Sequence, residues 1–196
     1  MKTYKTLHRV LRDMKAAIIV GSARKGGNTD VQSQSVAEAL AEKGFDVETI
    51  YPYDMKIQHC TGCNRCITEG RCHIRDEMQV IYDSFDEADL FILATPVYFS
   101  GPSSIIKQVI DRFQCRWDSV DEPESSKYVA LLCNGGSRQP RFENVISIAR
   151  AFAFGTRCRW AGECIVDSTD ASDVSRCAKP AYKFGLELFE KVTEEL

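Results

Sequence analysis

The stretch Lys15-Ala-Ala-Ile-Ile-Val-Gly-Ser-Ala-Arg-Lys-Gly-Gly-Asn-Thr29 decides the fold of this 196-residue chain. Its first half, Ala16–Gly21, is apolar and predicts a strand, whereas Ser22–Asp30 is rich in turn formers and potential helix caps. A helix is then predicted from about Asp30 to Lys43, and a second strand over Asp46–Ile50. The stretch therefore predicts the strand, loop and helix order of an α/β protein.

The same alternation continues along the chain. Apolar strands are predicted over Leu90–Ala94, with Pro96 ending the strand, over Tyr128–Cys133 and over Trp160–Val166, and helices are predicted over 78–85, 105–113, 145–152 and 174–192. Five strands joined through helices require right-handed crossovers, which place them in a parallel, doubly wound sheet with helices on both faces. We expect one domain over 15–196, an N-terminal extension over 1–14 and a cysteine-rich loop insertion at about 55–75.

Composition argues against several classes of function. The 25 basic and 28 acidic residues leave a net charge of −3, which is too balanced for a nucleic-acid-binding surface or a polybasic membrane anchor. No apolar stretch approaches the roughly 20 residues that span a bilayer. The segment Met1–Lys15 has no continuous apolar core of the kind found in a secretory signal, so we expect a cytoplasmic protein.

The first loop carries groups that suit a phosphate: hydroxyls at Ser22 and Thr29, the Arg24 guanidinium and free amides at a helix start. A Walker loop would need Lys at position 27 and Ser or Thr at 28, where this chain has Gly27 and Asn28. The second glycine of a dinucleotide fingerprint is replaced by alanine. A hydroxyl-bearing loop of this kind suits a phosphomonoester such as that of FMN, and an ordinary strand-to-helix turn is the alternative.

Nine cysteines without a secretory signal favour metal or redox chemistry over disulfides. Cys60, Cys63, Cys66 and Cys72 form the pattern C-x2-C-x2-C-x5-C, in which three closely spaced thiolates and a fourth from a short loop can hold a [4Fe-4S] cluster. Zinc bound by four thiolates is one alternative, and reduced thiols without a metal are another. The remaining cysteines have no ligand spacing and are interpreted as buried apolar residues.

Two further loops follow predicted strands, where doubly wound proteins bind ligands. Pro96–Pro102 offers backbone amides and the rings of Tyr98 and Phe99, beside which a flat heterocycle would fit; rings that merely cover the core are the alternative. The glycines of Asn134-Gly135-Gly136 allow a ring to approach the backbone closely, although a tight turn explains them nearly as well. We expect both loops to line one ligand site.

Together these motifs resemble the iron-sulfur flavoproteins, which belong to the flavodoxin-like superfamily of NADPH-dependent FMN reductases. The resemblance covers roughly Lys15–Phe113 and is carried by residues 21–29, the cysteine run 60–72, Asp76-Glu77-Met78, Ala88-Asp89, and Thr95–Phe99 with Lys107 and Asp111-Arg112. It implies the flavodoxin-like strand order 2-1-3-4-5, and assembly as a homodimer or homotetramer.

The resemblance also implies a set of site residues. Ser22, Arg24, Asn28 and Thr29 would hold the FMN phosphate, Pro96, Val97, Tyr98 and Phe99 would line the isoalloxazine ring, and Cys60, Cys63, Cys66 and Cys72 would ligate a cluster near the flavin. Gly27, Gly135 and Gly136 complete the expected cofactor-binding residues.

The leading hypothesis is an FMN-dependent oxidoreductase or electron-transfer flavoprotein that passes electrons between FMN and a [4Fe-4S] cluster. Its expected donor is ferredoxin or NAD(P)H, its acceptor is a small molecule such as a quinone, a flavin or an oxygen species, and no catalytic side chain is expected. One alternative is an FMN-only NAD(P)H-dependent FMN or quinone reductase with unligated cysteines. The other is a non-catalytic redox sensor or zinc-stabilised binding module, because a fold alone does not determine function.

Overall fold

Five parallel strands form the centre of the computed structural model, which describes residues 14–117, 126–171 and 173–194. They are β1 (Lys15–Val20), β2 (Asp46–Ile50), β3 (Leu90–Tyr98), β5 (Tyr128–Asn134) and β6 (Arg159–Val166), and they lie in the order β2-β1-β3-β5-β6. Counted along the chain as parallel strands, this order is 2-1-3-4-5, which confirms the prediction. The direction of winding reverses between β1 and β3, and doubly wound proteins bind ligands at that point.

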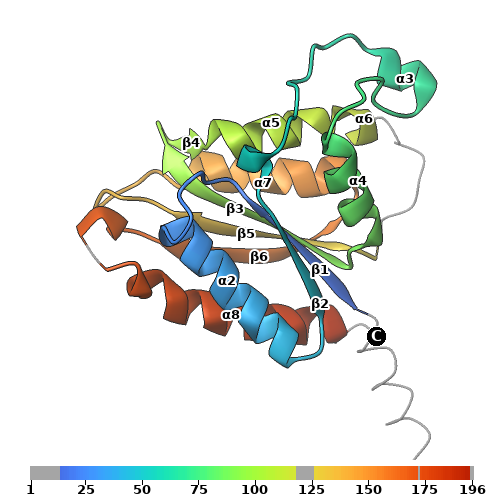
Figure 1. Cartoon of the computed structure of the whole chain (residues 1–196). Coiled ribbons are helices and arrows are strands. Elements are labelled where there is room, and N and C mark those ends of the chain that lie inside the picture. Colours follow the sequence, from blue (N-terminus) through green and yellow to red (C-terminus); the bar gives the residue numbers. More distant parts are fainter. Residues whose placement is uncertain (1–13, 118–125, 172, 195–196) are drawn as a thin grey trace, which may run out of the picture.

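Helices cover both faces of the sheet (Figure 1). Helices α2 (Asn28–Glu42) and α8 (Ser175–Thr193) pack on one face, whereas α4 (Met78–Glu87), α5 (Ser104–Arg112) and α7 (Glu143–Gly155) pack on the other. Side chains alternate along β1: Ile18 and Val20 join the core beneath α2 and α8, and Ala17 and Ile19 join the core beneath the other three helices. Burial on both faces explains why this strand is an unbroken apolar run in the sequence.

The third parallel strand ends later than predicted. Strand β3 continues past Pro96, which pairs with Asn134 of β5. The proline is tolerated because β1 ends at Val20, opposite Ala94, so that no β1 residue lies across from Pro96 to need its missing N–H. A short strand, β4 (Gly101–Pro102), then turns back antiparallel to β3, within a segment that the sequence predicts as a loop.

The cysteine-rich insertion lies between β2 and α4 and holds two short helices, η1 (Pro52–Asp54) and α3 (Arg65–Glu69). Figure 1 shows α3 projecting away from the sheet, beyond α5 and α6 (Gln114–Trp117). We call residues 59–73 the cysteine segment; none of them is buried. Within this segment, the half-buried Cys72 packs against the edge of the hydrophobic core.

The remaining expectations about the chain's organisation concern its ends. The predicted N-terminal extension over 1–14 lies outside the described residues except for Met14, which is buried against the core. No helix in the described part of the chain combines the length and the apolar character that a membrane span needs.

Candidate functional site

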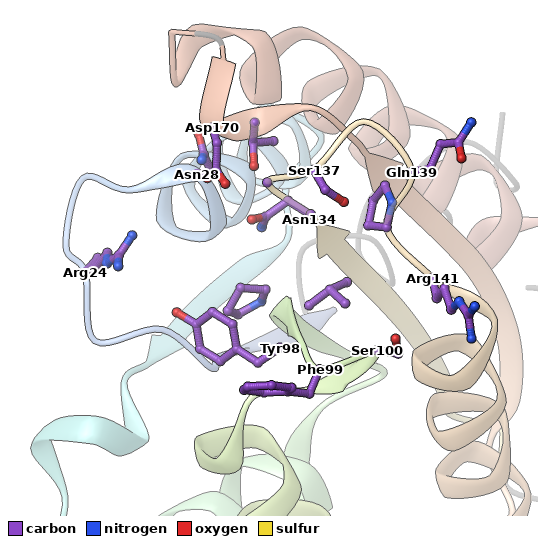
Figure 2. A pocket seen from close by; sticks show the side chains of 16 residues that line it. Arg24, Asn28, Tyr98, Phe99, Ser100, Asn134, Ser137, Gln139, Arg141 and Asp170 are labelled. Atoms are coloured by element: carbon purple, nitrogen blue, oxygen red, sulfur yellow. The ribbon is translucent and has the colours of Figure 1, made fainter.

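A pocket of about 520 Å³ lies at the carboxyl ends of the central strands, where the strand order reverses. Its walls are the loop before α2, the turn between β3 and β4, and the loop after β5, and residues that follow β6 close one side (Figure 2). The predicted cofactor-binding residues that line it are Arg24, Asn28, Pro96, Val97, Tyr98, Phe99, Gly135 and Gly136. The fold thus brings three separate loops of the sequence to one cavity.

The loop before α2 presents the positive end of a helix. Gly27 is the N-cap of α2, and no side chain caps this end, so the first amides of the helix are available to a ligand. Asp30 fixes the shape of the loop, because its carboxylate accepts hydrogen bonds from the Gly26 N–H (2.6 Å) and from the Tyr51 hydroxyl (2.8 Å). This arrangement suits an anion at the mouth of the loop.

The other predicted residues of this loop fall into two groups. Arg24 and Asn28 line the pocket, and Arg24 makes no ion pair with any described residue. Ser22 and Thr29 are buried: Ser22 Oγ accepts a hydrogen bond from the Arg24 N–H (3.2 Å), and Thr29 Oγ1 accepts one from Asn134 Nδ2 (2.9 Å). In this structure their hydroxyls hold the loop in place and tie it to the end of β5.

The turn between β3 and β4 presents the predicted aromatic pair. Tyr98 pairs with Gly101 across the turn, so Phe99 and Ser100 are its two central residues, with φ angles of +49° and +62°. A left-handed backbone at a non-glycine residue costs on the order of 1 kcal/mol or more. The turn holds the Phe99 ring fully exposed and the Tyr98 ring half exposed at the rim of the pocket (Figure 2).

The loop after β5 forms a wall of backbone. A Cβ added at Gly135 would lie 2.4 Å from the ring of Pro140, and one added at Gly136 would lie 2.0 Å from the carboxylate of Asp170. Only glycine fits at both positions without movement of these neighbours. The Gly135 N–H donates to the carbonyl oxygen of Val166 (2.9 Å), which ties the loop to the end of β6. Both glycines are therefore required by the packing of this loop, which lines the pocket.

Other lining residues were not among the predicted cofactor-binding set: Ser100, Asn134, Ser137, Gln139, Pro140, Arg141, Thr169 and Asp170. Ser100 and Asn134 belong to loops that were expected to line the site, and the rule that ligands bind beyond the carboxyl ends of the strands could also have found Asp170, which follows β6. Arg141 has no such signal, because its place depends on how the loop after β5 folds.

The four predicted metal ligands, Cys60, Cys63, Cys66 and Cys72, lie in the cysteine segment and do not line the pocket. All nine cysteines belong to the described residues, and none forms a disulfide. Cys63 Sγ lies 3.4 Å from His73 Nδ1, but no three His, Cys, Asp or Glu side chains of the described residues gather closely enough to hold a metal ion. Four thiols are a donor set that suits an iron-sulfur cluster or zinc. In this structure no three of these four side chains converge on a common point.

Arg112 anchors the cysteine segment where it leaves and rejoins the domain. Its guanidinium donates to the Asp76 carboxylate (2.6 and 3.0 Å) and to the Gln58 carbonyl oxygen (2.8 Å), and Gln108 Nε2 donates to the Ile57 carbonyl oxygen (2.6 Å). Burial disfavours the charged form of Asp76, but the hydrogen bonds from Arg112 and from backbone amides outweigh it and lower the pKa of that carboxyl. Both stems of the segment thus meet at the end of α5.

The fold and the pocket define a flavodoxin-like α/β protein with a ligand site at the reversal point of its sheet. The chain belongs to the NADPH-dependent FMN reductase family, whose model matches residues 14–159. A curated relative from Methanosarcina thermophila, named iron-sulfur flavoprotein, is 33% identical over 133 residues, which are 68% of this chain and 69% of the relative. These matches confirm the family predicted from the sequence.

Two further comparisons show how much of each relative the similarity covers and that it extends to the fold. A protein from Archaeoglobus fulgidus, also named iron-sulfur flavoprotein, is 39% identical over 99 residues, 50% of this chain and 45% of the relative. The chain thus spans about half the length of the first curated relatives that it matches, at 45%, 51% and 48%. A solved structure, the NAD(P)H:quinone oxidoreductase from Methanothermobacter marburgensis, has a TM-score of 0.69 at 16% identity, over 89% of this chain and 98% of that one, which establishes similarity of fold.

Proposed function

We propose that the protein binds FMN in the pocket and acts as an FMN-dependent oxidoreductase. The observation that carries this proposal is the pocket between the uncapped start of α2 and the exposed aromatic turn, at the reversal point of the sheet. Gly135 and Gly136 line the same pocket on the side of β5. Bound FMN supplies the exchange of a hydride or of single electrons.

The loop before α2 would hold the phosphate of FMN. Arg24 contributes a guanidinium that makes no ion pair with the described residues, Asn28 lines the same wall, and the first amides of α2 have no side-chain cap. Ser22, Gly27 and Thr29 would keep the loop in the conformation that presents these groups.

The turn after β3 and the loop after β5 would hold the ring. Pro96–Phe99 would cover one side, and Gly135 and Gly136 the other. These residues bind and orient the ring and limit the access of water to it. We assign no proton-transfer role to any side chain, because the transfer of a hydride or of electrons to the flavin depends on stacking and distance.

The proposed electron donor is NAD(P)H or ferredoxin, and the proposed acceptor is a small molecule such as a quinone, a flavin or an oxygen species. Membership of the NADPH-dependent FMN reductase family supports NAD(P)H. We also propose that residues 15–196 form one domain and that the protein assembles as a homodimer or homotetramer.

We propose further that Cys60, Cys63, Cys66 and Cys72 ligate a [4Fe-4S] cluster. The four-thiol donor set and the names of the relatives support this assignment. The segment would have to close around the metal, and no buried side chain of residues 59–73 opposes that movement. The second candidate is an FMN-only reductase, which the open arrangement of the thiols among the described residues favours.

Anaerobic purification followed by FMN, iron, sulfide and zinc analysis on one sample tests both assignments. The proposal predicts about one FMN and about four iron and four sulfide per chain. Cys66→Ser should lose iron and sulfide and keep FMN, whereas Cys115→Ser, which alters a thiol outside the segment, should keep all three. FMN without iron in the native protein would establish the FMN-only candidate, and absence of FMN after titration would overturn the proposed function.

A further inference from the structure

Arg112 has one buried N–H group that does not take part in anchoring the cysteine segment. Its other guanidinium N–H groups are engaged: two donate to the Asp76 carboxylate, one donates to the Gln58 carbonyl oxygen (2.8 Å), and one approaches the Ile74 carbonyl oxygen (3.5 Å). The Nε–H is buried and meets no acceptor among the described residues. Burying a donor without an acceptor is costly, so this atom calls for an explanation.

The shape of the guanidinium shows which part of the chain this N–H faces. The group is planar and rigid, and its Nε–H points in the same direction as the outer N–H of Nη2. Both Nη atoms bind Asp76 between them, so the outer N–H of Nη2 is the one directed at the Ile74 carbonyl oxygen, where the segment rejoins the domain. The Nε–H therefore faces the returning chain, on which Cys72 lies two residues before Ile74.

Cys72 differs from the other three proposed metal ligands in its contact with the domain. All four are described residues, and Cys72 alone among them packs against the core beneath α4, α5 and α7. The electrostatics agree: burial disfavours the charged form of Arg112, but the hydrogen bond to Asp76 and nearby charges, that of Cys72 among them, outweigh it and raise its pKa. Cys72 is therefore held within electrostatic reach of the buried guanidinium, and the other three thiols would have to move towards it.

We propose that Arg112 is a positioning residue for Cys72, whose Sγ accepts a hydrogen bond from the unpartnered Nε–H when this thiolate ligates a metal cluster. The inference rests on the proposed [4Fe-4S] assignment and adds to it a residue that is not itself a ligand. A thiolate is a suitable acceptor for a charged donor. Hydrogen bonds to the sulfurs of a cluster help to set its reduction potential. Because the donor is a cation, the contact favours the more negative, reduced form and raises that potential.

The conservative variant Arg112→Lys tests this hydrogen bond, because it keeps a positive charge opposite Asp76 and removes the Nε–H. Wild type and variant are purified anaerobically, their iron and sulfide are measured, and the cluster is titrated with dithionite while its electron paramagnetic resonance signal is recorded. At a given potential, Arg112→Lys should shift the ratio of reduced to oxidised cluster by about three- to tenfold towards the oxidised form. For a one-electron couple this is a lowering of the potential by about 30–60 mV.

Two control variants separate this contact from a general loosening of the segment. Asp76→Asn breaks the same ion pair but keeps the Nε–H and removes a negative charge, so the potential should stay the same or rise. Arg71→Gln removes an exposed charge beside Cys72, which solvent screens, and should change the potential far less than Arg112→Lys does.

The outcomes divide as follows between support and refutation. An unchanged potential in Arg112→Lys, or an equal lowering in Asp76→Asn or Arg71→Gln, would overturn the inference. Loss of the cluster from both Arg112→Lys and Asp76→Asn would also overturn it, because the ion pair alone would then hold the segment. Loss of iron from Arg112→Lys alone would support it, since hydrogen-bond partners of metal ligands typically contribute about 10- to 100-fold to metal affinity.

Analysis of FMN, iron and sulfide in the wild type separates this inference from the proposed function. A wild type that binds FMN but no iron would overturn the cluster assignment and this inference, and would leave the FMN-dependent function in place. A wild type with iron and sulfide but no FMN would overturn the proposed function, and the titration would still test Arg112. A cluster whose potential does not depend on Arg112 would overturn this inference alone.

Discussion

Arg112 and Asp76, 36 residues apart in the sequence, form an ion pair with two parallel hydrogen bonds and almost no contact with solvent. Their side chains are 0% and 6% exposed. Burying two charges is costly, and their mutual attraction offsets that cost only while both partners and their hydrogen bonds are in place. Removing one partner leaves the other charge buried without compensation.

Arg112→Gln should therefore lower the free energy of unfolding by about 3–5 kcal/mol. Urea unfolding of the FMN-free protein measures this loss. The matched control is Arg116→Gln, because Arg116 pairs with Asp86 at the exposed surface and its loss should cost less than about 1 kcal/mol. Equal losses of unfolding free energy in the two variants would mean that the buried pair contributes no more to stability than the exposed pair.

The same pair predicts how stability depends on pH. Because Arg112 and backbone amides hold the pKa of Asp76 below its ordinary value of 3.8, the native state keeps this carboxylate ionised more readily than the unfolded chain does. The resulting stabilisation is complete above that ordinary value and is lost as the pH falls through the lowered native pKa. Wild-type stability should thus fall more steeply than that of Asp76→Asn below about pH 4. Parallel slopes in urea unfolding at pH 6 to pH 2 would refute this assignment.

Arg24→Gln should weaken FMN binding by about 10- to 100-fold, which corresponds to the loss of a hydrogen bond to a charged group. Riboflavin, which has no phosphate, should bind the variant and the wild type alike. Lys25→Gln serves as the control, because Lys25 is the next residue, is paired with Asp54 and does not line the pocket. Quenching of flavin fluorescence gives all the dissociation constants, and an equal loss of riboflavin affinity would place Arg24 elsewhere than at the phosphate.

Five of the nine thiols should divide into two classes of reactivity. Burial, together with the neighbouring Cys164, raises the pKa of Cys133 to about 12, and burial raises the pKa of Cys164 to about 11 and that of Cys158 and Cys177 above its ordinary value. Iodoacetamide at pH 8 should spare these four thiols in the folded, metal-free protein and modify Cys63, which is exposed. Mass spectrometry of the peptides reads out each position. Rapid modification of Cys133 under these conditions would show that the core opens.

Much of the fold follows from local patterns in the sequence. Ala16–Val20 is buried on both faces and is therefore an unbroken apolar run in the sequence, and β3 and β5 repeat that pattern. The predicted end of the third strand at Pro96 is wrong, although a proline normally ends a strand. Only the length of the neighbouring β1 shows that the missing N–H of Pro96 leaves no hydrogen bond unmade. Strand ends thus depend on partners that the local sequence does not specify.

The candidate site was predicted less completely than the fold. Glycines and aromatic rings after strands mark two walls, since backbone freedom and flat side chains leave a local signature. Arg141 leaves none, because its position comes from Pro140 and Phe142 packing over Gly135. The ion pair of Arg112 with Asp76 could not be predicted from the sequence either, because the two residues meet only after the insertion folds back onto α5.

The two ends of the cysteine segment meet on a single guanidinium, so the points where the chain leaves and rejoins the sheet layer lie side by side. A chain that leaves the domain at Gln58 and returns by Ile74, both within reach of Arg112, can gain, lose or rebuild everything between them while the sheet keeps its register. A short linker in place of residues 59–73 is therefore expected to leave the pocket intact, because no residue of the segment lines it.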